Sequence, residues 1–351
     1  LWHTPGIGSY RLRNLLARFA AAPAVYKASL RELAQVEGID QVLAGHIKSN
    51  TDMSFAEQQL AALQRHQVRL LTYWDEEYPT LLKNCSDPPA LLFVKGSVEV
   101  LQQAQVALVG TRHPSSYGRL MAEKFSRELA AEGLVVTSGL ARGIDTYAHR
   151  AALSAGGWTI AVMASGVDII YPDENRALAH DITERGALVS EYPMTCKPEA
   201  SYFPRRNRII AGLSLGTLVI EAGQGSGALI TADNAVQNNR EVFAVPGNIN
   251  NPKSHGCNLL IQQGAKSILT TQDILVELAG FTARPKTEKP SLLLSDKEEN
   301  MLAVLNDQPM YIDVVAQQAG VSTQEALAVL LALELRGLVL QLAGKQFVLV
   351  P

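Results

Sequence analysis

The sequence predicts an α/β protein, because short buried strands alternate with helices through its middle. Between residues 105 and 281, apolar runs rich in β-branched residues are separated by about 12 to 25 residues of helical pattern, the length of a crossover helix. The runs do not alternate apolar and polar residues, which is typical of strands buried on both faces of a parallel sheet. We therefore predict a doubly wound, extended Rossmann-like, mostly parallel sheet. The strands are expected at 106–109, 134–137, 159–163, 187–189, 217–220 and 241–245.

The first 50 residues predict a small all-α domain of helix-hairpin-helix character. Helical patterns start at Tyr10 and Leu30, and the glycine turns at 5–8 and 37–40 have the form in which backbone N–H groups approach a phosphate. Such turns also serve purely as caps, so both interpretations stay open. Six basic and three acidic residues give this segment a charge of +3. Residues 51–104 form a connecting segment expected to pack on the central domain.

The C-terminal part predicts a linker at 282–294 and a winged-helix domain at 295–351. The linker is rich in Pro and Lys. Helices are expected from 296 to 305, from 312 to 319, and from Ser322 to Arg336 with a stop at Gly337, followed by a strand pair at 338–342 and 346–350. Seven acidic and three basic residues give this domain −4, which favours docking onto a protein over reading duplex DNA as a transcription factor.

Composition limits the function classes. The chain has 351 residues, 47% apolar and 19% charged, which predicts a folded protein. Its net charge of −3 excludes a globally basic nucleic-acid binder and leaves room for a local basic groove. The three cysteines are far apart, which fits a reducing cytoplasm, and no His, Cys or carboxylate spacing predicts a metal. No apolar run is long enough for a membrane segment. The chain begins at Leu1, so we expect native residues before it.

Two loops after predicted strands favour anion binding. Gly110-Thr111-Arg112 places an Arg beside a glycine turn at a helix entrance, while GxGxxG and Walker motifs are absent, so no nucleotide cofactor is expected. The loop Ser138-Gly139-Leu-Ala-Arg142-Gly-Ile-Asp145 precedes His149. Asp145 and His149 are one helical turn apart and so could act as an acid/base pair, but helix capping by Asp145 is the stronger interpretation.

The most informative stretch begins at Phe203 and contains three arginines and an amide. If Pro204 opens a helix, Arg205 and Arg208 share one face and Phe203 stands just outside the helix start. An aromatic beside cationic groups can stack a base and hold its phosphates. The alternative is a solvated Arg turn with Phe203 in the core. The predicted contacts here are Phe203, Arg205, Arg206, Asn207 and Arg208.

A third glycine loop follows Glu221 and leads into a helix. Gly223, Gly225 and Gly227 alternate with Gln224 and Ser226, a pattern typical of an anion-binding nest. Glu221 either accepts hydrogen bonds from the glycine loop or acts as a carboxylate in a nucleotide-processing enzyme. Further along, Ser254 and Asn258 suit helix capping or a phosphate contact.

These motifs together resemble the DNA-processing protein A family (DprA, also called Smf). The resemblance rests on Gly110–Arg112, 138–145, 203–210, 225–232, 245–247 and 258–265, and it covers the α/β domain from end to end. The family's N-terminal modules resemble SAM or helix-hairpin-helix domains, and a winged helix is common at the C-terminus. The family usually has a Gly at the position of Asn239.

The resemblance implies a homodimeric, cytoplasmic DNA-binding protein of natural transformation rather than an enzyme. Such proteins protect incoming single-stranded DNA and load the RecA recombinase onto it. Arg112, Phe203, Arg205, Asn207 and Arg208 would line the DNA groove, with Gly225 and Ser226 at backbone phosphates. The wider predicted site adds Gly110, Thr111, Ser138, Gly139, Arg142, Arg206, Gly227, Ser254 and Asn258. No catalytic residue, cofactor or metal is expected. The alternative is a phosphoribohydrolase-like, nucleotide-processing enzyme that uses Glu221 and the glycine loops.

Overall fold

The computed structural model describes residues 1–278, 295–306, 309–335, 338–342 and 344–349. The chain divides into two compact units, residues 1–286 and 287–351. The predicted linker at 282–294 lies outside the described residues. Among those described, no helix is long and apolar enough to cross a membrane.

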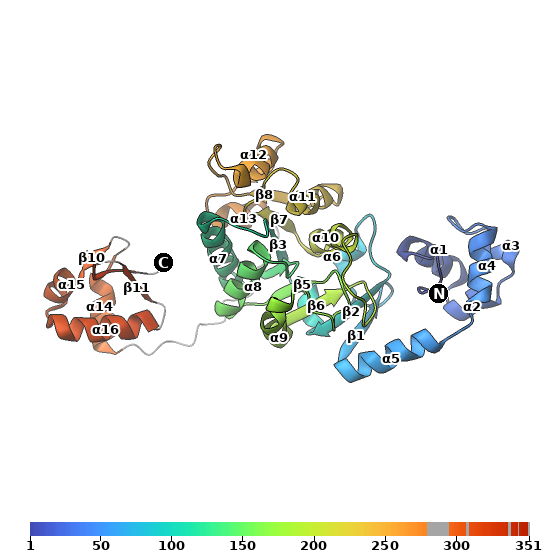
Figure 1. The fold of residues 1–351 in the computed structure, drawn as a ribbon, viewed down its shortest axis with the longest axis horizontal. Coiled ribbons are helices and arrows are strands. Elements are labelled where there is room, and N and C mark those ends of the chain that lie inside the picture. The colour runs from blue at the N-terminus through green and yellow to red at the C-terminus, as the bar shows by residue number, and fades with distance from the viewer. Residues whose placement is uncertain (279–294, 307–308, 336–337, 343, 350–351) are drawn as a thin grey trace. The chain divides into compact units, whose positions relative to one another are not determined.

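One mixed sheet organises the first unit (Figure 1). Its described strands run in the order β1-β2-β6-β5-β4-β3-β7-β8-β9. The strands from β6 to β9 in this order pair in parallel, and β1 and β2 add an antiparallel edge. The bounds are β1 Val68–Thr72, β2 Leu91–Gly96, β3 Gln105–Val109, β4 Val135–Ser138, β5 Thr159–Val162, β6 Gly186–Ser190, β7 Gly216–Val219, β8 Glu241–Ala244 and β9 Lys266–Ser267.

Helices cover both faces of this sheet. The larger ones are α5 Ser54–His66, α7 Ser116–Ala131, α8 Ile144–Ser154, α9 Arg176–Glu184, α10 Tyr202–Leu213, α11 Gly227–Gln237, α12 His255–Gln262 and α13 Thr271–Glu277. Shorter ones are α6 Thr80–Lys83 and the 3₁₀ turns Glu99–Gln102, Asp173–Asn175 and Pro252–Ser254.

Strand side chains alternate between two sets of core residues. On β3, Ala107 and Val109 pack in the core that contains α10 and α11, whereas Val106 and Leu108 pack in the core that contains α7 and α8. A strand buried on both faces cannot alternate apolar and polar residues, which explains the unalternated runs. The doubly wound prediction is confirmed, and all six predicted strands end within one residue of β3 to β8.

The strand order reverses between β3 and β7. Crossovers through α7, α8 and α9 build the sheet outward from β3 to β6, and α10 then returns the chain to the other side of β3 as β7. At such a switch point the loops after the two central strands diverge and leave a crevice. The loops after β3 and β7 are the glycine loops singled out in the sequence.

The N-terminal part of this unit is helical, with α1 Ser9–Phe19, α2 Ala22–Lys27, α3 Leu30–Leu33 and α4 Gln41–Ser49. Leu15, Val25 and Ile47 are fully buried in its core. Both glycine turns require left-handed backbone, with φ of 82° at Gly6 and 81° at Gly38. The Arg11 side chain joins the turns, since it donates to the carbonyl oxygens of both glycines at 2.8 Å.

The second unit confirms the winged helix. It contains α14 Asp296–Val304, α15 Ile312–Ala319, α16 Thr323–Leu335 and the strands β10 Met310–Tyr311, β11 Val339–Leu342 and β12 Gln346–Leu349. The predicted hairpin is present, and β10 adds a short third strand beside β12. Phe347, Leu330 and Val315 are fully buried in a core of its own. The predicted helix stop at Gly337 lies outside the described residues.

Candidate nucleic-acid interface

A groove of about 850 Å³ opens at the switch point. It is lined by the loop after β3, by the start of α10 and by the glycine loop that leads into α11. The lining residues that carry the argument are Gly110, Thr111, Arg112, Tyr171, Phe203, Asn207, Gly225, Ser226 and Gly227.

The loop after β3 is held by backbone contacts on both sides. The N–H of Thr111 donates to the carbonyl of Glu221 after β7 (2.8 Å), and the carbonyl of Thr111 accepts from the N–H of Ile144 (3.2 Å). A side chain at Gly110 would meet Ile144 at 2.5 Å. The loop is thus fixed between two elements, and Arg112 is the cationic side chain that it contributes to the groove lining, beside Thr111 and His113.

Arg112, Phe203 and Tyr171 form an aromatic and cationic cluster in the groove. The Arg112 guanidinium lies over the Phe203 ring at 5.3 Å, and the rings of Tyr171 and Phe203 meet edge to face at 5.8 Å. Phe203 is half-buried and 46% of Tyr171 is exposed, so both present ring surface to a ligand. Sequence reasoning missed Tyr171, although it lies in the loop that follows β5, where the switch-point rule directs attention.

The start of α11 lines the groove with two open glycines. A Cβ added at Gly225 or Gly227 would have nothing within 4 Å, so both positions are open. The Ser226 hydroxyl caps the helix by accepting from the N–H of Ala228 at 3.3 Å. Asn207 joins α10 to this loop through a 3.1 Å hydrogen bond to the carbonyl of Gly227. A helix N-terminus with open glycines suits a phosphate.

The three arginines of α10 lie on two faces of the helix. Arg206 is 4% exposed and donates to the carbonyl oxygens of Gly139 and Val162, so it lines the groove as a nearly buried side chain held by backbone. Burial lowers its pKa to about 10, and Asp145 partly offsets this. Asp145 in turn accepts from the N–H groups of Gly139 and Ala141 in the loop before α8. The N-cap of α8 is Gly143 rather than Asp145, so the interpretation of Asp145 as a helix cap was wrong.

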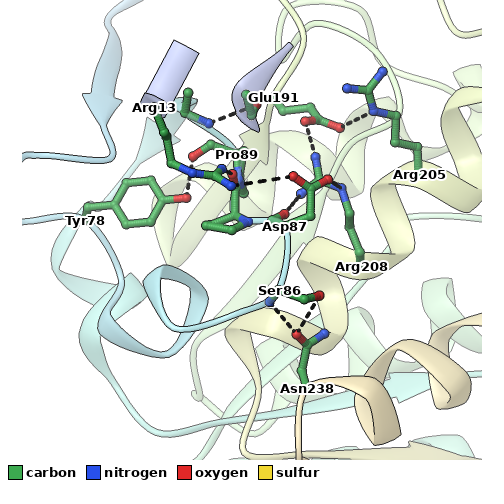
Figure 2. A network of polar contacts seen from close by, with 12 residues as sticks. Arg13, Tyr78, Ser86, Asp87, Pro89, Glu191, Arg205, Arg208 and Asn238 are labelled. Atoms are coloured by element: carbon green, nitrogen blue, oxygen red, sulfur yellow. Dashed lines mark hydrogen bonds and ion pairs between the residues drawn. The ribbon is translucent and has the colours of Figure 1, made fainter. Parts of the chain in front are cut away.

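Arg205 and Arg208 share a face, as predicted, and Figure 2 shows both beside Glu191. Neither side chain is part of the groove lining. Both pair with Glu191, which follows β6, and Arg208 also pairs with Asp87. The helix begins at Tyr202 rather than at Pro204, so Phe203 belongs to its first turn and shares the groove face with Asn207. The expected position of Phe203 outside the helix was therefore wrong.

Other predicted contacts have structural partners. The buried Ser138 hydroxyl donates to the carbonyl of Leu108, and the exposed Arg142 pairs with Glu174 at 3.0 Å. Asn258 both accepts from and donates to the backbone of Gly247, and Ser254 is buried against the same glycine. Ser138, Ser254 and Asn258 are not part of the groove lining.

The two candidate catalytic side chains are buried. Glu221 is 2% exposed and accepts from both the N–H and the hydroxyl of Ser115, the N-cap of α7. His149 is fully buried beside Thr159, and burial lowers its pKa to about 3. In the part of the chain that the structure describes, no group of three His, Cys, Asp or Glu residues suits a metal ion. Neither Glu221 nor His149 is part of the groove lining.

Comparison with known proteins gives the family. A model of the DNA recombination-mediator protein A family matches residues 69–279. The chain belongs to this family. A model of the DprA winged helix domain matches residues 282–345. The family match contains every segment of the groove. Asn239, at the position where the resemblance implied a Gly, has left-handed backbone with φ of 53°.

Relatives in the family match most of the chain. Protein Smf of Synechocystis sp. is 33% identical over 97% of this chain and 95% of its own length, and protein Smf of Escherichia coli is 42% identical over 82% and 79%. The X-ray structure of DNA processing protein A from Streptococcus pneumoniae matches with a TM-score of 0.69 and 37% identity, covering 78% of this chain and 94% of that one. A structure of DNA processing protein A from Helicobacter pylori, described for its single-stranded DNA binding mode, matches with a TM-score of 0.55 and 31% identity, covering 60% and 95%.

Proposed function

We propose that the switch-point groove binds single-stranded DNA without sequence preference. The observation that carries this proposal is that Arg112, Phe203 and Tyr171 line the same groove as the open start of α11. Aromatic rings stack on any base, and backbone N–H groups with an Arg bind phosphates, so neither contact depends on sequence. The Helicobacter pylori relative's described single-stranded DNA binding supports the same ligand here.

Family membership supports three further parts of the proposal. The bound strand is DNA taken up in natural transformation, the chain acts as a cytoplasmic homodimer, and it loads the RecA recombinase onto the strand. These parts rest on the resemblance and not on the groove. RecA loading is tested by measuring the rate of RecA filament formation on single-stranded DNA with and without this protein. An unchanged rate contradicts loading.

Binding is tested by fluorescence anisotropy with labelled single- and double-stranded DNA over a salt series. Phe203→Ala is expected to weaken single-strand binding by about 1–3 kcal/mol for purine and pyrimidine strands alike. Arg112→Ala should reduce the slope of log affinity against log salt by about 0.7, the value for one lost phosphate contact on a single strand.

Phe203→Trp is the matched control, because it keeps an aromatic face at the same position. Its affinity should stay near that of the unchanged protein. Binding that does not fall with salt, or equal affinity in Phe203→Ala and Phe203→Trp, would contradict the groove as the binding site.

A nucleotide-processing activity lacks support, since the buried Glu221 carboxylate already accepts hydrogen bonds from the N–H and the hydroxyl of Ser115.

A further inference from the structure

The segment Ser86–Ala90, which we call the strap, contacts three parts of the first unit that are distant in sequence. It follows α6 and leads into β2. Its polar partners lie in the N-terminal helical part, on α10 and at the end of α11 (Figure 2). The Tyr78 hydroxyl also donates to the carbonyl of Pro89 at 2.7 Å, which fixes the strap on its inner side.

On one side the strap binds α1. The N–H of Ala90 donates to the buried Ser9 hydroxyl at 3.1 Å, and Ala90 belongs to the N-terminal core. Arg13 donates to the carbonyl of Pro88, and its Nη2 lies 4.0 Å from the Asp87 carboxylate. Only 15% of the Arg13 side chain is exposed. Arg13 therefore belongs to an interior contact rather than to the free basic surface of α1.

On the other side the strap binds the two helices that line the groove. Asp87 pairs with Arg208 of α10 at 3.4 Å, and Arg208 also donates to the Asp87 carbonyl. The Asn238 side chain at the end of α11 accepts from the N–H of Ser86 at 2.9 Å. The first turns of these helices carry the groove residues Phe203 and Gly227. The strap contacts both helices further toward their C-termini.

Charges alternate along this connection from α1 to α10. Arg13, Asp87, Arg208, Glu191 and Arg205 follow one another as ion-pair partners. The Arg208 and Glu191 side chains are only 12% and 7% exposed, so each needs its partner because a buried unpaired charge is costly. Burial raises the pKa of Glu191, and Arg208 and Arg205 oppose that effect. Arg208 thus links α10 directly to Asp87 of the strap.

We propose that Arg13 and Asp87 are positioning residues for the DNA groove: the N-terminal helices hold the strap, and the strap sets the angle of α10 and with it the place of Phe203 and Asn207. This inference rests on the proposed function. It gives the N-terminal helices a role in DNA affinity that needs no contact between them and the strand.

The first experiment removes the negative charge of Asp87 in the full-length chain and asks whether DNA binding becomes tighter or weaker. Asp87→Asn removes a negative charge near a polyanion, so direct electrostatics would tighten binding of a labelled oligothymidine strand. The positioning role instead weakens it, and coupling between sites of about 1–3 kcal/mol corresponds to a loss of about fivefold or more. Tighter or unchanged binding by Asp87→Asn would overturn the proposal.

The second experiment compares Arg13→Gln with Arg18→Gln, which removes the same charge from the same helix. Arg18 is exposed and bonds to Gln35, outside the strap. Only Arg13→Gln should weaken binding, and its salt slope should stay unchanged because no phosphate contact is lost. A reduced slope would mean that Arg13 touches DNA directly, and equal losses in both variants would mean a general charge effect; either result overturns the positioning role.

Hydrogen exchange separates failure of this inference from failure of the proposed function. Without DNA, Arg13→Gln should expose the amides of α10 to faster exchange than Arg18→Gln does, because α10 loses part of its anchoring. Equal exchange rates of the α10 amides in both variants overturn the coupling, even when both variants are as stable as the unchanged protein. If the unchanged protein binds no single strand, the proposed function fails, and the exchange comparison still decides whether the strap couples the N-terminal helices to α10.

Discussion

Two buried basic side chains of the central domain keep different charge states. Arg206 has backbone carbonyl partners and the nearby Asp145 carboxylate, and its pKa stays high enough, at about 10, to keep its charge. His149 has the Thr159 hydroxyl at 2.7 Å, and its Nε2 atom has no hydrogen-bond partner in the described structure. Burial, together with the positive charge of Arg206, lowers the pKa of His149 to about 3, so this imidazole is neutral in the folded protein at pH 7.

The neutral His149 predicts a pH dependence of stability. The pKa of His149 is about 3 in the folded protein and 6.5 in the unfolded chain. Between pH 3 and pH 6.5, His149 is therefore protonated in the unfolded chain and neutral in the folded protein. His149 therefore costs no stability above pH 6.5, and stability falls as the pH is lowered through that window by up to about 1.4 kcal/mol per pH unit. His149→Gln should lack this component.

Urea unfolding of both proteins from pH 7 to pH 4.5 measures the effect. The stability advantage of the unchanged protein over His149→Gln should shrink steadily below pH 6.5. Contributions of Asp145 and Glu191, whose pKa values burial raises, are common to both proteins and cancel in the difference. A difference that is independent of pH would show that His149 titrates normally in the folded state.

At the scale of the element, a substitution at the start of α11 should change DNA affinity much more than folding stability. Gly227→Ala adds a methyl group where the structure has open space and ordinary backbone, so the free energy of unfolding should change by no more than about 0.5 kcal/mol. The same methyl group stands where a phosphate would meet the helix start, and loss of a hydrogen bond to a charged group costs about 1.5–3 kcal/mol of DNA affinity. Anisotropy and thermal unfolding measure the two quantities.

Gly45→Ala is the matched control on α4. It also adds a methyl group in open space and should raise stability by about 0.5–1 kcal/mol, as in a helix interior, without changing DNA affinity. If Gly227→Ala binds the strand as tightly as Gly45→Ala does, the start of α11 is not a phosphate site.

Elements were easier to predict than side-chain directions. Burial on both faces leaves an unmistakable apolar pattern, so β3 to β8 could be located within one residue, whereas β1 and β2 form an antiparallel edge whose short runs lack the flanking crossover helices. The Arg205–Arg208 cluster predicted a basic surface on α10. Its outcome depends on Glu191 and Asp87, which are 14 or more residues away in sequence, so no local pattern could show that these arginines are paired.

At the scale of the whole molecule, net charge conceals a division between the parts. The total of −3 combines +3 in residues 1–50, −3 in residues 51–100, 0 in residues 101–275, +1 in residues 276–294 and −4 in residues 295–351. Binding of a polyanion by such a protein depends on where single cations lie. In the first unit several arginines are already paired, as Arg205 and Arg208 are with Glu191, while Arg112 lies over an aromatic ring in the groove.

The two units have separate cores, so the groove should function without the winged helix. Every residue that lines the groove lies in the first unit, and the core of the second unit contains only residues from Met301 onward. Effects of distant, independent sites usually add within about 0.3–0.5 kcal/mol, so a fragment of residues 1–286 should bind single-stranded DNA within about twofold of the full chain. Anisotropy at one salt concentration measures this, with Phe203→Ala in the fragment as the control for groove binding. A large loss in the fragment would show that the strand also contacts the winged helix, and a large gain would show that this acidic unit competes with DNA for the groove.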